Sequence, residues 1–225
     1  MRTRANYPPP IQSGTWKKGS LKAVALCLAF ASGSLVARFA AAAPETWRFD
    51  PVHSQIWFSG DHEKFSHPLG RLRIADGWFA FDEKDWSASR VDVVIDLRSA
   101  DMGDPKWNDA VKSAQLLDAA RWPSAHFVST RVEQTDARHG VIHGNLDLHG
   151  ITNDVDVAFT LNRIGTDPYA FKRKAGFSAS ATLHRFDFGM TRYADVVGNE
   201  IDLRFEIEGI RDRDAATQTT NGKPR

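Results

Sequence analysis

Three neighbouring residues, Asp50, His53 and Ser54, have the types that a nucleophile–base–acid triad requires. Within one turn they cannot stack the serine on the histidine and the histidine on the aspartate, and the chain has no G-x-S-x-G elbow. We therefore interpret them as a turn in which Asp50 and Ser54 bond backbone amides while His53 packs. No residue is assigned a catalytic role on this pattern.

His62 is a second residue whose side chain is suited to ligand binding or acid–base chemistry. Strand parity places it on the same face as Ile56, Phe58 and Gly60, which is the apolar face of its segment. An inward histidine either hydrogen-bonds the head group of a ligand near a rim, or is a core histidine satisfied by its protein neighbours. Both interpretations remain open at this stage.

The other histidines do not form a metal-ligand pattern. They are His67, His126, His139, His143, His149 and His184. None lies in a Cys/His spacing, and His62-Glu63 lacks the second histidine of H-E-x-x-H. His143 and His149 share a strand face but lie about 20 Å apart along a strand. We expect no metal site.

The remaining chemically distinctive residues indicate structure. Carboxylates at alternate positions, such as Asp92 with Asp96, lie opposite the apolar stripes and predict a solvated exterior. The tryptophans after the leader favour packing between strands over stacking of sugars or bases. They are Trp47, Trp57, Trp78, Trp86, Trp107 and Trp122. Trp107 and Trp122 flank a predicted helix and can gate a cavity mouth.

The elements that position these residues are short strands with a two-residue apolar period. The stripes of 91–97, 155–161 and 201–207 each mark one buried side of a half-solvated sheet. Strands are predicted at 47–62, 70–82, 90–101, 124–134, 139–149, 154–163, 174–184 and 200–210. Regular turns between them favour a closed barrel or a sandwich. Residues 106–121 have helical spacing, end before Pro123, and predict a short helix that caps one end.

Small residues at inward positions raise the question of a cavity. Gly60, Ala179 and Ala181 lie on apolar faces, flanked by Phe and Leu. A barrel of about eight strands either fills its interior with side chains or holds one ligand, depending on how many inward positions are small. The sequence leaves an elongated apolar cavity and a core filled by Phe and Trp as equal alternatives.

The two ends of the chain predict export and a loose tail. Basic residues precede an apolar run from Ala23 to Val36, and alanines end in a cleavage site that we place after Ala42. Residues 1–42 are thus a cleaved signal peptide, and the apolar run is too short for a stable membrane anchor. The one cysteine, Cys27, leaves with the signal, which suits the bacterial periplasm. Residues 212–225 predict a disordered tail.

Removing residues 1–42 also changes the charge. They contain six basic residues and no acidic ones, so the mature chain keeps 23 basic against 28 acidic residues, a net charge of −5. Binding to nucleic acid or to anionic lipid by long-range attraction is therefore not expected. Residues 43–211 suffice for one domain with a good core.

Several local strings together resemble the YceI family of lipocalin-like proteins. They are Trp47-Arg48-Phe49-Asp50-Pro51-Val52-His53-Ser54, Gly77-Trp78-Phe79, Ala120 to Thr130, Gly144-Asn145-Leu146-Asp147-Leu148-His149-Gly150, His184-Arg185-Phe186-Asp187-Phe188-Gly189-Met190 and Glu206-Ile207-Glu208-Gly209-Ile210. The resemblance spans 45–211. It implies an all-β fold, an eight-stranded antiparallel lipocalin-like barrel with a short capping helix. It also implies non-enzymatic binding, carriage or storage of a polyisoprenoid or isoprenoid quinone in the periplasm.

The resemblance and strand parity together select the expected ligand-binding positions. These are Ile56, Phe58, His62, Phe79, Phe81, Val93, Ile95, Leu117, Phe127, Phe177, Ala179, Ala181 and Phe205. The chain departs from the family's usual strings at His62-Glu63-Lys64 and at Trp107-Asn108-Asp109-Ala110, where a head-group contact is expected. The bound lipid or quinone is the ligand, and no other cofactor is expected.

Three further interpretations stay open beside the lipid carrier. One is an enzyme acting on the same lipid, with His62 as acid or base. Another is an interaction module that presents Trp57 and Trp78 to a membrane redox partner such as a cytochrome. A homodimer is the third, and the sequence separates none of these from a carrier, which also needs somewhere to deliver.

Overall fold

The computed structural model describes residues 43–219. The signal peptide predicted for 1–42 lies outside the described residues and stays a prediction. Within the described range, neither helix has the length and hydrophobicity needed to cross a bilayer.

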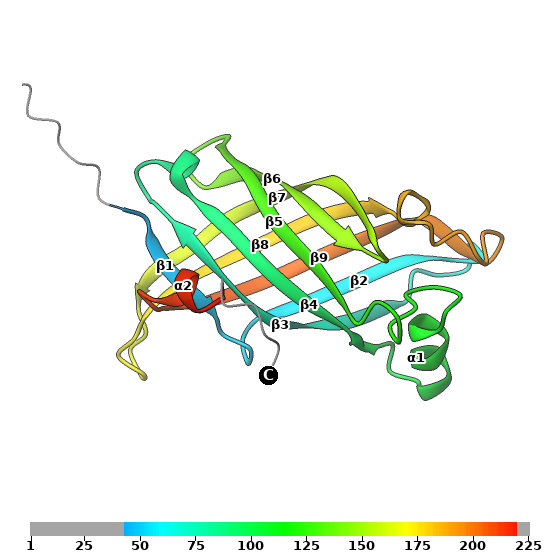
Figure 1. Cartoon of the computed structure of the whole chain (residues 1–225). Helices are drawn as coiled ribbons and strands as arrows, with labels where there is room; N and C mark the ends of the chain where they lie inside the picture. The colour runs from blue at the N-terminus through cyan, green and yellow to red at the C-terminus, as the bar shows by residue number, and fades with distance from the viewer. Residues whose placement is uncertain (1–42, 220–225) are drawn as a thin grey trace, which may run out of the picture. The chain divides into compact units, whose positions relative to one another are not determined.

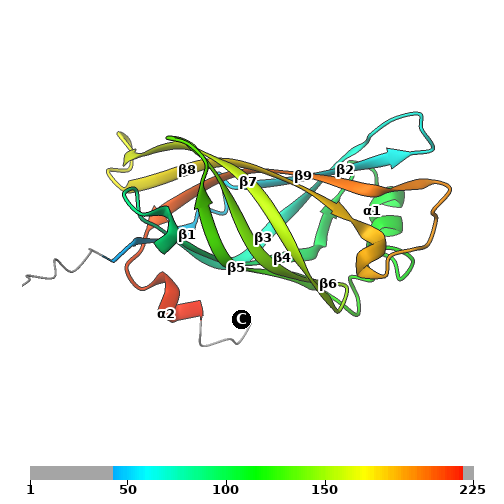
Figure 2. The ribbon, with the colours of Figure 1, turned by 90° about the horizontal axis from the view of Figure 1, so that it is seen from above.

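One antiparallel sheet makes up most of the described chain (Figure 1). Its strands are β1 (Glu45–Phe49), β2 (Gln55–His62), β3 (Leu69–Phe81), β4 (Arg90–Asp101), β5 (Ser124–Gln134), β6 (His139–Leu148), β7 (Ile151–Thr166), β8 (Arg173–His184) and β9 (Val197–Arg211). From β2 the order runs through β9, β8, β7, β6, β5 and β4 to β3, and β3 pairs again with β2. The sheet therefore closes, and the predicted eight-stranded antiparallel barrel is confirmed (Figure 2).

The ninth strand arises because one barrel position is filled by a broken strand. The single strand expected at 47–62 is wrong, since it is interrupted between β1 and β2. β1 pairs with β3 and β9, the same two neighbours that flank β2. The Asp50 carboxylate accepts hydrogen bonds from the amides of Val52 and His53, at 3.0 and 3.3 Å, and closes a turn there. The other seven strands end within three residues of the expected limits.

The predicted helix is shorter than its sequence period suggested. Helix α1 spans Pro105–Lys112, whereas helical spacing continued to Arg121. Asp104 caps its start by accepting the amides of Lys106 and Trp107, at 2.9 and 3.1 Å. After Lys112 the backbone turns extended at Ser113, whose hydroxyl donates to the Ala110 carbonyl instead of continuing the helix. Two short 3₁₀ turns, η1 (Trp86–Ala88) and η2 (Arg185–Phe188), join strands elsewhere.

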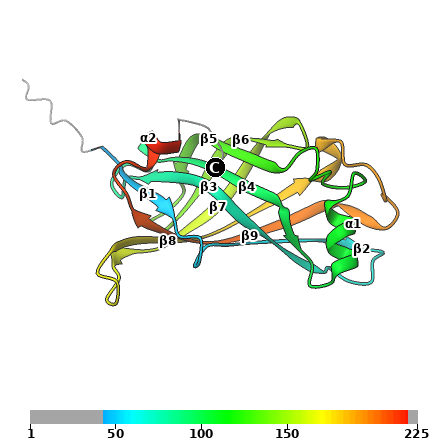
Figure 3. The same cartoon turned by 60° about the horizontal axis from the view of Figure 1, so that its bottom comes forward.

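Residues after β9 continue as structure, so the disordered tail is wrong for 212–219. Helix α2 (Ala215–Thr219) lies beside β1 (Figure 3), and Ala215 is fully buried. The amide of Asp212 donates to the Thr46 carbonyl at 3.0 Å, and Arg48 donates to the Asp212 carboxylate at 3.2 Å. These contacts bury one side of the segment, which its polar composition did not indicate. Residues 220–225 lie outside the described part.

The predicted alternation of inward and outward residues is present in the barrel wall. In β5, Ala125, Phe127 and Ser129 are buried, while His126 and Val128 between them are exposed. Inward residues form two packed clusters. Aromatic rings dominate the cluster beside β1, and aliphatic side chains dominate the other.

Candidate ligand-binding cavity

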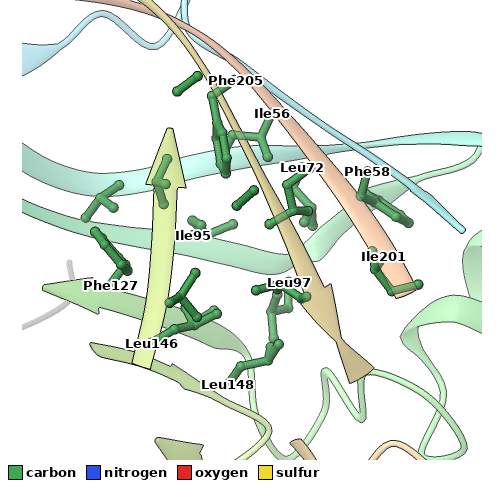
Figure 4. Close-up of a pocket in the computed structure, with 18 of the residues that line it drawn as sticks. Ile56, Phe58, Leu72, Ile95, Leu97, Phe127, Leu146, Leu148, Ile201 and Phe205 are labelled. Carbon is green, nitrogen blue, oxygen red and sulfur yellow. The ribbon is translucent and has the colours of Figure 1, made fainter. Parts of the chain in front are cut away.

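A cavity of about 500 Å³ lies inside the barrel, and side chains from all eight barrel positions line it (Figure 4). This volume lies within the range of about 300–1,000 Å³ that is usual for small-molecule sites. The lining is almost wholly aliphatic and aromatic. Its strongly polar members are Asp61, His62, Ser89 and Arg185. Of the two alternatives that the sequence left open, the structure has the hollow interior.

All thirteen residues expected to bind a ligand line this cavity. Many of them are only partly buried although they point into the barrel. Val93, Ile95 and Phe205, for example, are of intermediate exposure. A residue in the interior of a filled barrel would be inaccessible, so this exposure is to the cavity. That these residues bind a ligand stays a prediction.

Two small residues on β8 leave part of the interior open. Ala179 pairs with Phe159 of β7 and Phe205 of β9, and Ala181 pairs with Leu203. Methyl groups between longer neighbours form a recess in the wall. Gly60 has a different role, because a Cβ there would come within 2.8 Å of the Ile201 side chain. This glycine makes room for a neighbouring side chain.

Packed aromatic rings close the end of the barrel beside β1. We call this set the aromatic plug: Trp47, Phe79, Phe81, Trp86, Phe159 and Phe177. Phe177 meets Phe79 edge-on, with ring centroids 5.5 Å apart, and Trp86 stacks on Phe159 at 5.2 Å. Such pairs are the favoured aromatic geometries. All six side chains of the plug are at most 9% exposed, so this end of the barrel is densely packed.

The opposite end carries the mouth of the cavity. Trp107 and Tyr193 both line the cavity and are 40% and 52% exposed, so the cavity reaches the surface between them. Trp107 belongs to α1, and the Trp107 ring lies against His62 at 5.4 Å between centroids. The prediction that Trp107 gates a mouth therefore agrees with its position. Trp122 instead packs on His149, with ring centroids 6.5 Å apart, and does not line the cavity.

Three contacts tie together the segments around the mouth. His62 at the end of β2 meets Trp107 of α1. The guanidinium of Arg192 donates to the Gln115 side chain at 2.8 Å, which joins the loop before β9 to the segment after α1. The amide of Glu63 donates to the Val196 carbonyl at 2.8 Å. The mouth is thus bounded by the β2–β3 hairpin, α1 and the loop before β9.

The two departures from the family strings lie at this mouth and have local structural roles. Glu63 and Lys64 form the tip of the β2–β3 hairpin, with φ of 52° and 60°. Asn108 ties the start of α1 to the chain before it, because it accepts the Met102 amide at 2.5 Å and donates to Asp101 at 3.2 Å. These residues shape the entrance without pointing a catalytic group into it.

Arg185 lines the cavity and was not among the residues that the sequence selected. Its side chain is 3% exposed, and its five N–H donors bond the backbone carbonyls of one loop. Those carbonyls belong to Met190, Arg192, Tyr193, Val197 and Gly198. Burial lowers the pKa of this guanidinium, and no carboxylate within residues 43–219 forms an ion pair with it. Arg185 therefore shapes the loop that bounds the mouth, while its donors are all occupied by protein.

The triad interpretation fails on geometry, as expected from the spacing. His53 Nδ1 lies 2.8 Å from an Asp50 oxygen, but the Ser54 hydroxyl donates to the Glu208 carbonyl at 3.0 Å. The serine is therefore bonded to backbone and has no histidine base. Burial pushes the pKa of Asp50 up, yet hydrogen bonds from His53 and from the amides of Val52 and His53 outweigh it and leave a lowered pKa.

The same turn, together with β9, forms the one cluster within residues 43–219 whose possible ligand atoms have metal-binding spacing. It consists of Asp50, His53 and Glu208. The Lys174 ammonium lies 3.5 Å from Asp50 and 3.0 Å from Glu208, and so supplies the positive charge between the carboxylates. The Glu208 hydrogen bond, followed by Asp167, raises the pKa of Lys174, which keeps this group charged. We assign no metal site to the cluster.

Other histidines lie apart from one another on the outer wall. His126 contacts Asp92 at 2.8 Å, and His143 contacts Asp156 at 2.6 Å. His143 also lies 3.7 Å from Glu133, and all three contacts cross between neighbouring strands, which is a common surface arrangement. These pairs are consistent with the solvated exterior that the alternating carboxylates indicated.

A closed antiparallel barrel with an apolar interior, sealed at one end and open at the other, defines the class of lipocalin-like ligand-binding barrels. A sequence profile described as the YceI-like domain matches residues 47–209. The chain is 34% identical to a UPF0312 protein of Enterobacter sp. (strain 638) over 188 residues, 83% of this chain and 97% of that protein. It is 32% identical to Protein YceI of Salmonella newport (strain SL254), covering 88% of this chain and 100% of that protein. The chain therefore belongs to the YceI-like family, which confirms the resemblance.

Solved structures share the fold at low sequence identity. BcnA of Burkholderia cenocepacia is 20% identical, with a TM-score of 0.62 over 71% of this chain and 98% of BcnA. A polyisoprenoid binding domain from Saccharophagus degradans, implicated in plant cell wall breakdown, is 14% identical, with a TM-score of 0.56 over 74% of this chain and 98% of that domain. These similarities extend to the architecture alone.

Proposed function

We propose that this protein binds, and carries or stores, an isoprenoid lipid or isoprenoid quinone in the bacterial periplasm, without chemical conversion. The observation that carries the proposal is the apolar cavity of about 500 Å³ inside the barrel. The polyisoprenoid binding described for the Saccharophagus domain of the same fold supports it. Export through residues 1–42 is part of the proposal, because such a lipid has to be moved between membranes across water.

The distribution of polar groups sets the orientation of the ligand. Asp61 and His62 lie at the mouth, whereas the wall beyond them is apolar up to the aromatic plug. A head group placed at the mouth keeps its hydrogen bonds to water or to His62, and the tail extends inward among aliphatic side chains. Burying a polar group deep in the barrel would cost about 1–3 kcal/mol for each missing hydrogen bond.

The cavity can supply enough affinity by apolar contact alone. At about 0.3 kcal/mol per heavy atom, some ~27 heavy atoms reach the ~8 kcal/mol of micromolar binding, before the cost of ordering the chain. Such binding does not depend on charge and is insensitive to salt. This agrees with the net charge of −5 on the mature chain, which does not attract anionic ligands over long range.

The arrangement of ionisable groups favours carriage over catalysis. Among the described residues, the ionisable side chains that line the cavity are Asp61, His62 and Arg185, together with Tyr193 at the mouth. Asp61 accepts the Lys64 amide at 2.6 Å, and Arg185 is saturated by carbonyls. His62 packs on Trp107 and faces no nucleophile. An acid–base step at His62 is the alternative, and His62→Gln with unchanged turnover would exclude it.

The test is to identify what the protein carries. We would export the full chain in a bacterium, purify the mature protein, extract it with organic solvent and analyse the extract by mass spectrometry. The expected result is close to one isoprenoid lipid or quinone per protein, and an intact mass that begins at residue 43. A ligand-free wild type, prepared so that lipid is retained, would overturn the proposal.

A matched pair of variants ties the bound lipid to the cavity. Ala181→Phe places a ring in the recess of the wall, while Ser180→Phe places the same ring on the exposed outer face of the same strand. We expect lipid content to fall at least tenfold in the first variant and to stay unchanged in the second. Equal lipid content in both would show that the lipid binds elsewhere.

A further inference from the structure

Four exposed apolar side chains surround the mouth of the cavity. We call them the mouth rim: Phe65, Leu69, Trp107 and Tyr193. Phe65 and Leu69 come from the β2–β3 hairpin, Trp107 from α1 and Tyr193 from the loop before β9. Their exposures are 87%, 63%, 40% and 52%. Apolar side chains grouped in this way at the opening of a site mark an interaction surface.

The hairpin presents Phe65 as a built feature. The amide of Lys64 donates to Asp61 at 2.6 Å, and the amide of His62 donates to the Ser66 carbonyl at 2.9 Å. The Phe65 amide in turn donates to the His62 carbonyl at 3.0 Å. This tight turn holds a phenyl ring in water, where it contributes no packing to the barrel. Exposing an apolar ring to water is unfavourable in free energy, and this cost is recovered when the ring is buried against a partner.

The mouth rim is continuous with the cavity, which identifies the kind of partner. Trp107 and Tyr193 belong to both, so apolar surface runs from the interior out to the rim. A lipid tail that left the cavity into water would lose about 0.8 kcal/mol for each methylene exposed. The loss is avoided when the mouth faces an apolar phase. A bilayer surface meets that condition.

The charge around the mouth decides which membrane surface fits. The segments 61–69, 104–112 and 189–198 together carry four basic and five acidic residues. Docking driven by anionic lipid needs clusters of Lys and Arg, which these segments lack. Trp and Tyr rings prefer the boundary between head groups and acyl chains, whatever the head-group charge. The rim therefore fits a membrane through apolar insertion.

We propose that the mouth rim docks on the lipid bilayer surface, with Phe65 and Leu69 entering the interface beside Trp107 and Tyr193. The mouth then faces the membrane, and a lipid passes between bilayer and cavity past the His62–Trp107 contact. Lipid passage between bilayer and cavity rests on the proposed function, but docking itself is measurable on the protein without reference to its ligand.

The chain supplies its own matched control at the other end of the barrel. Tyr169 and Phe171, in the β7–β8 connection, are 92% and 82% exposed. The β7–β8 connection lies at the end of the barrel that carries β1, whereas α1, which bounds the mouth, lies at the opposite end (Figure 1). The aromatic plug separates Tyr169 and Phe171 from the cavity. They match the rim in exposure and differ in position.

The experiment measures binding of the mature protein to vesicles by flotation. One vesicle is pure phosphatidylcholine, and the other contains equal parts phosphatidylcholine and phosphatidylglycerol. We expect the wild type to bind both about equally, at low and at high salt. Phe65→Ser with Leu69→Thr should weaken binding roughly tenfold or more, since the two side chains lose their burial in the interface. Tyr169→Ser with Phe171→Asn should leave binding within about twofold.

Several results would overturn the docking proposal. Equal losses in the rim and control variants would show that exposed aromatics bind vesicles unspecifically. Binding to phosphatidylglycerol vesicles alone would replace the apolar mode by a charged one. The wild type could instead form a dimer at the concentration used and fail to bind vesicles. If the rim variant abolished that dimer, the rim would be assigned to contact with a second copy of the chain.

Lipid content separates this proposal from the proposed function. Phe65 and Leu69 do not line the cavity, so the rim variant should retain the lipid found in the wild type. Retained lipid with lost vesicle binding supports docking. Vesicle binding by a protein that carries no lipid would leave docking standing and refute the carrier.

Discussion

The ring of His62 lies against the ring of Trp107, with 5.4 Å between centroids, and this contact joins the end of β2 to α1 across the mouth of the cavity. Because no residue of α1 is buried, the helix is held over the mouth by few apolar contacts. On the proposed function, the pair is a barrier that the ligand has to pass.

The first prediction concerns this barrier. Trp107→Ala should speed ligand release roughly twofold to tenfold, since an aromatic pair contributes about 0.5–1.5 kcal/mol beyond its buried area. Dissociation of a fluorescent isoprenoid analogue, followed by stopped flow, measures the rate. Lys106→Ala, at the neighbouring exposed position of α1, is the control. Release that is equally fast in wild type and Trp107→Ala would mean that the ligand leaves by another route.

The second prediction concerns the aromatic plug. Trp86 is 3% exposed and packs on Phe81 and Phe159, with ring centroids 5.2 Å away in both pairs. Trp86→Ala should lower the free energy of unfolding by about 3–5 kcal/mol, because it leaves a large cavity at the closed end. Urea titration followed by circular dichroism measures the change. Phe171→Ala removes an exposed ring and should stay within about 0.5 kcal/mol.

A third prediction follows from the bonding of Arg185. Arg185→Met removes the guanidinium bonds to five carbonyls of the segment 190–198, of which the Tyr193 carbonyl keeps the amides of Val196 and Val197 as donors. We therefore expect a loss of roughly 3 kcal/mol or more in unfolding free energy. Arg185→Lys should recover only part of this, because an ammonium has three donors and no planar fork. The loop should also become sensitive to limited proteolysis. A loop that resists protease in Arg185→Met would argue that other contacts hold it.

The fourth prediction is a pH dependence of stability. Hydrogen bonds from the amides of Ala170 and Tyr169, and then from Lys174, lower the pKa of Asp167 to about 2. The unfolded value is about 3.9, so the carboxylate stabilises the fold fully above that pH and loses its contribution as the pH falls towards 2. Wild type should thus be more stable than Asp167→Asn at neutral pH.

Urea titrations at several pH values test this relation. The difference in unfolding free energy between wild type and Asp167→Asn should shrink between about pH 4 and pH 2. A constant difference across that interval would show that the carboxylate is bonded equally in the unfolded chain. Asp154→Asn, at an exposed position of β7, is the control.

The sequence by itself determined the barrel and the direction of its side chains. Successive residues of a strand point to opposite faces, so stripes such as Val91 to Leu97 identify both the strand and its inward side. For this reason the twelve selected residues that lie in strands all line the cavity, and Leu117, which follows α1, lines it as well. The turn at Asp50 was also readable, because an aspartate that bonds the amides after it is a local interaction.

Only the tertiary structure decided that the barrel is hollow and where it opens. Whether Ala179 borders a void or another ring depends on how far side chains from opposite walls reach, and no local pattern contains that distance. Trp86 joins the plug from a connection outside any strand period, and α2 is held by β1 from the far end of the chain. Arg185 is the extreme case, since its partners are backbone carbonyls. Every residue type has the same carbonyl, so the sequence does not indicate which ones Arg185 binds until the loop has folded around the guanidinium.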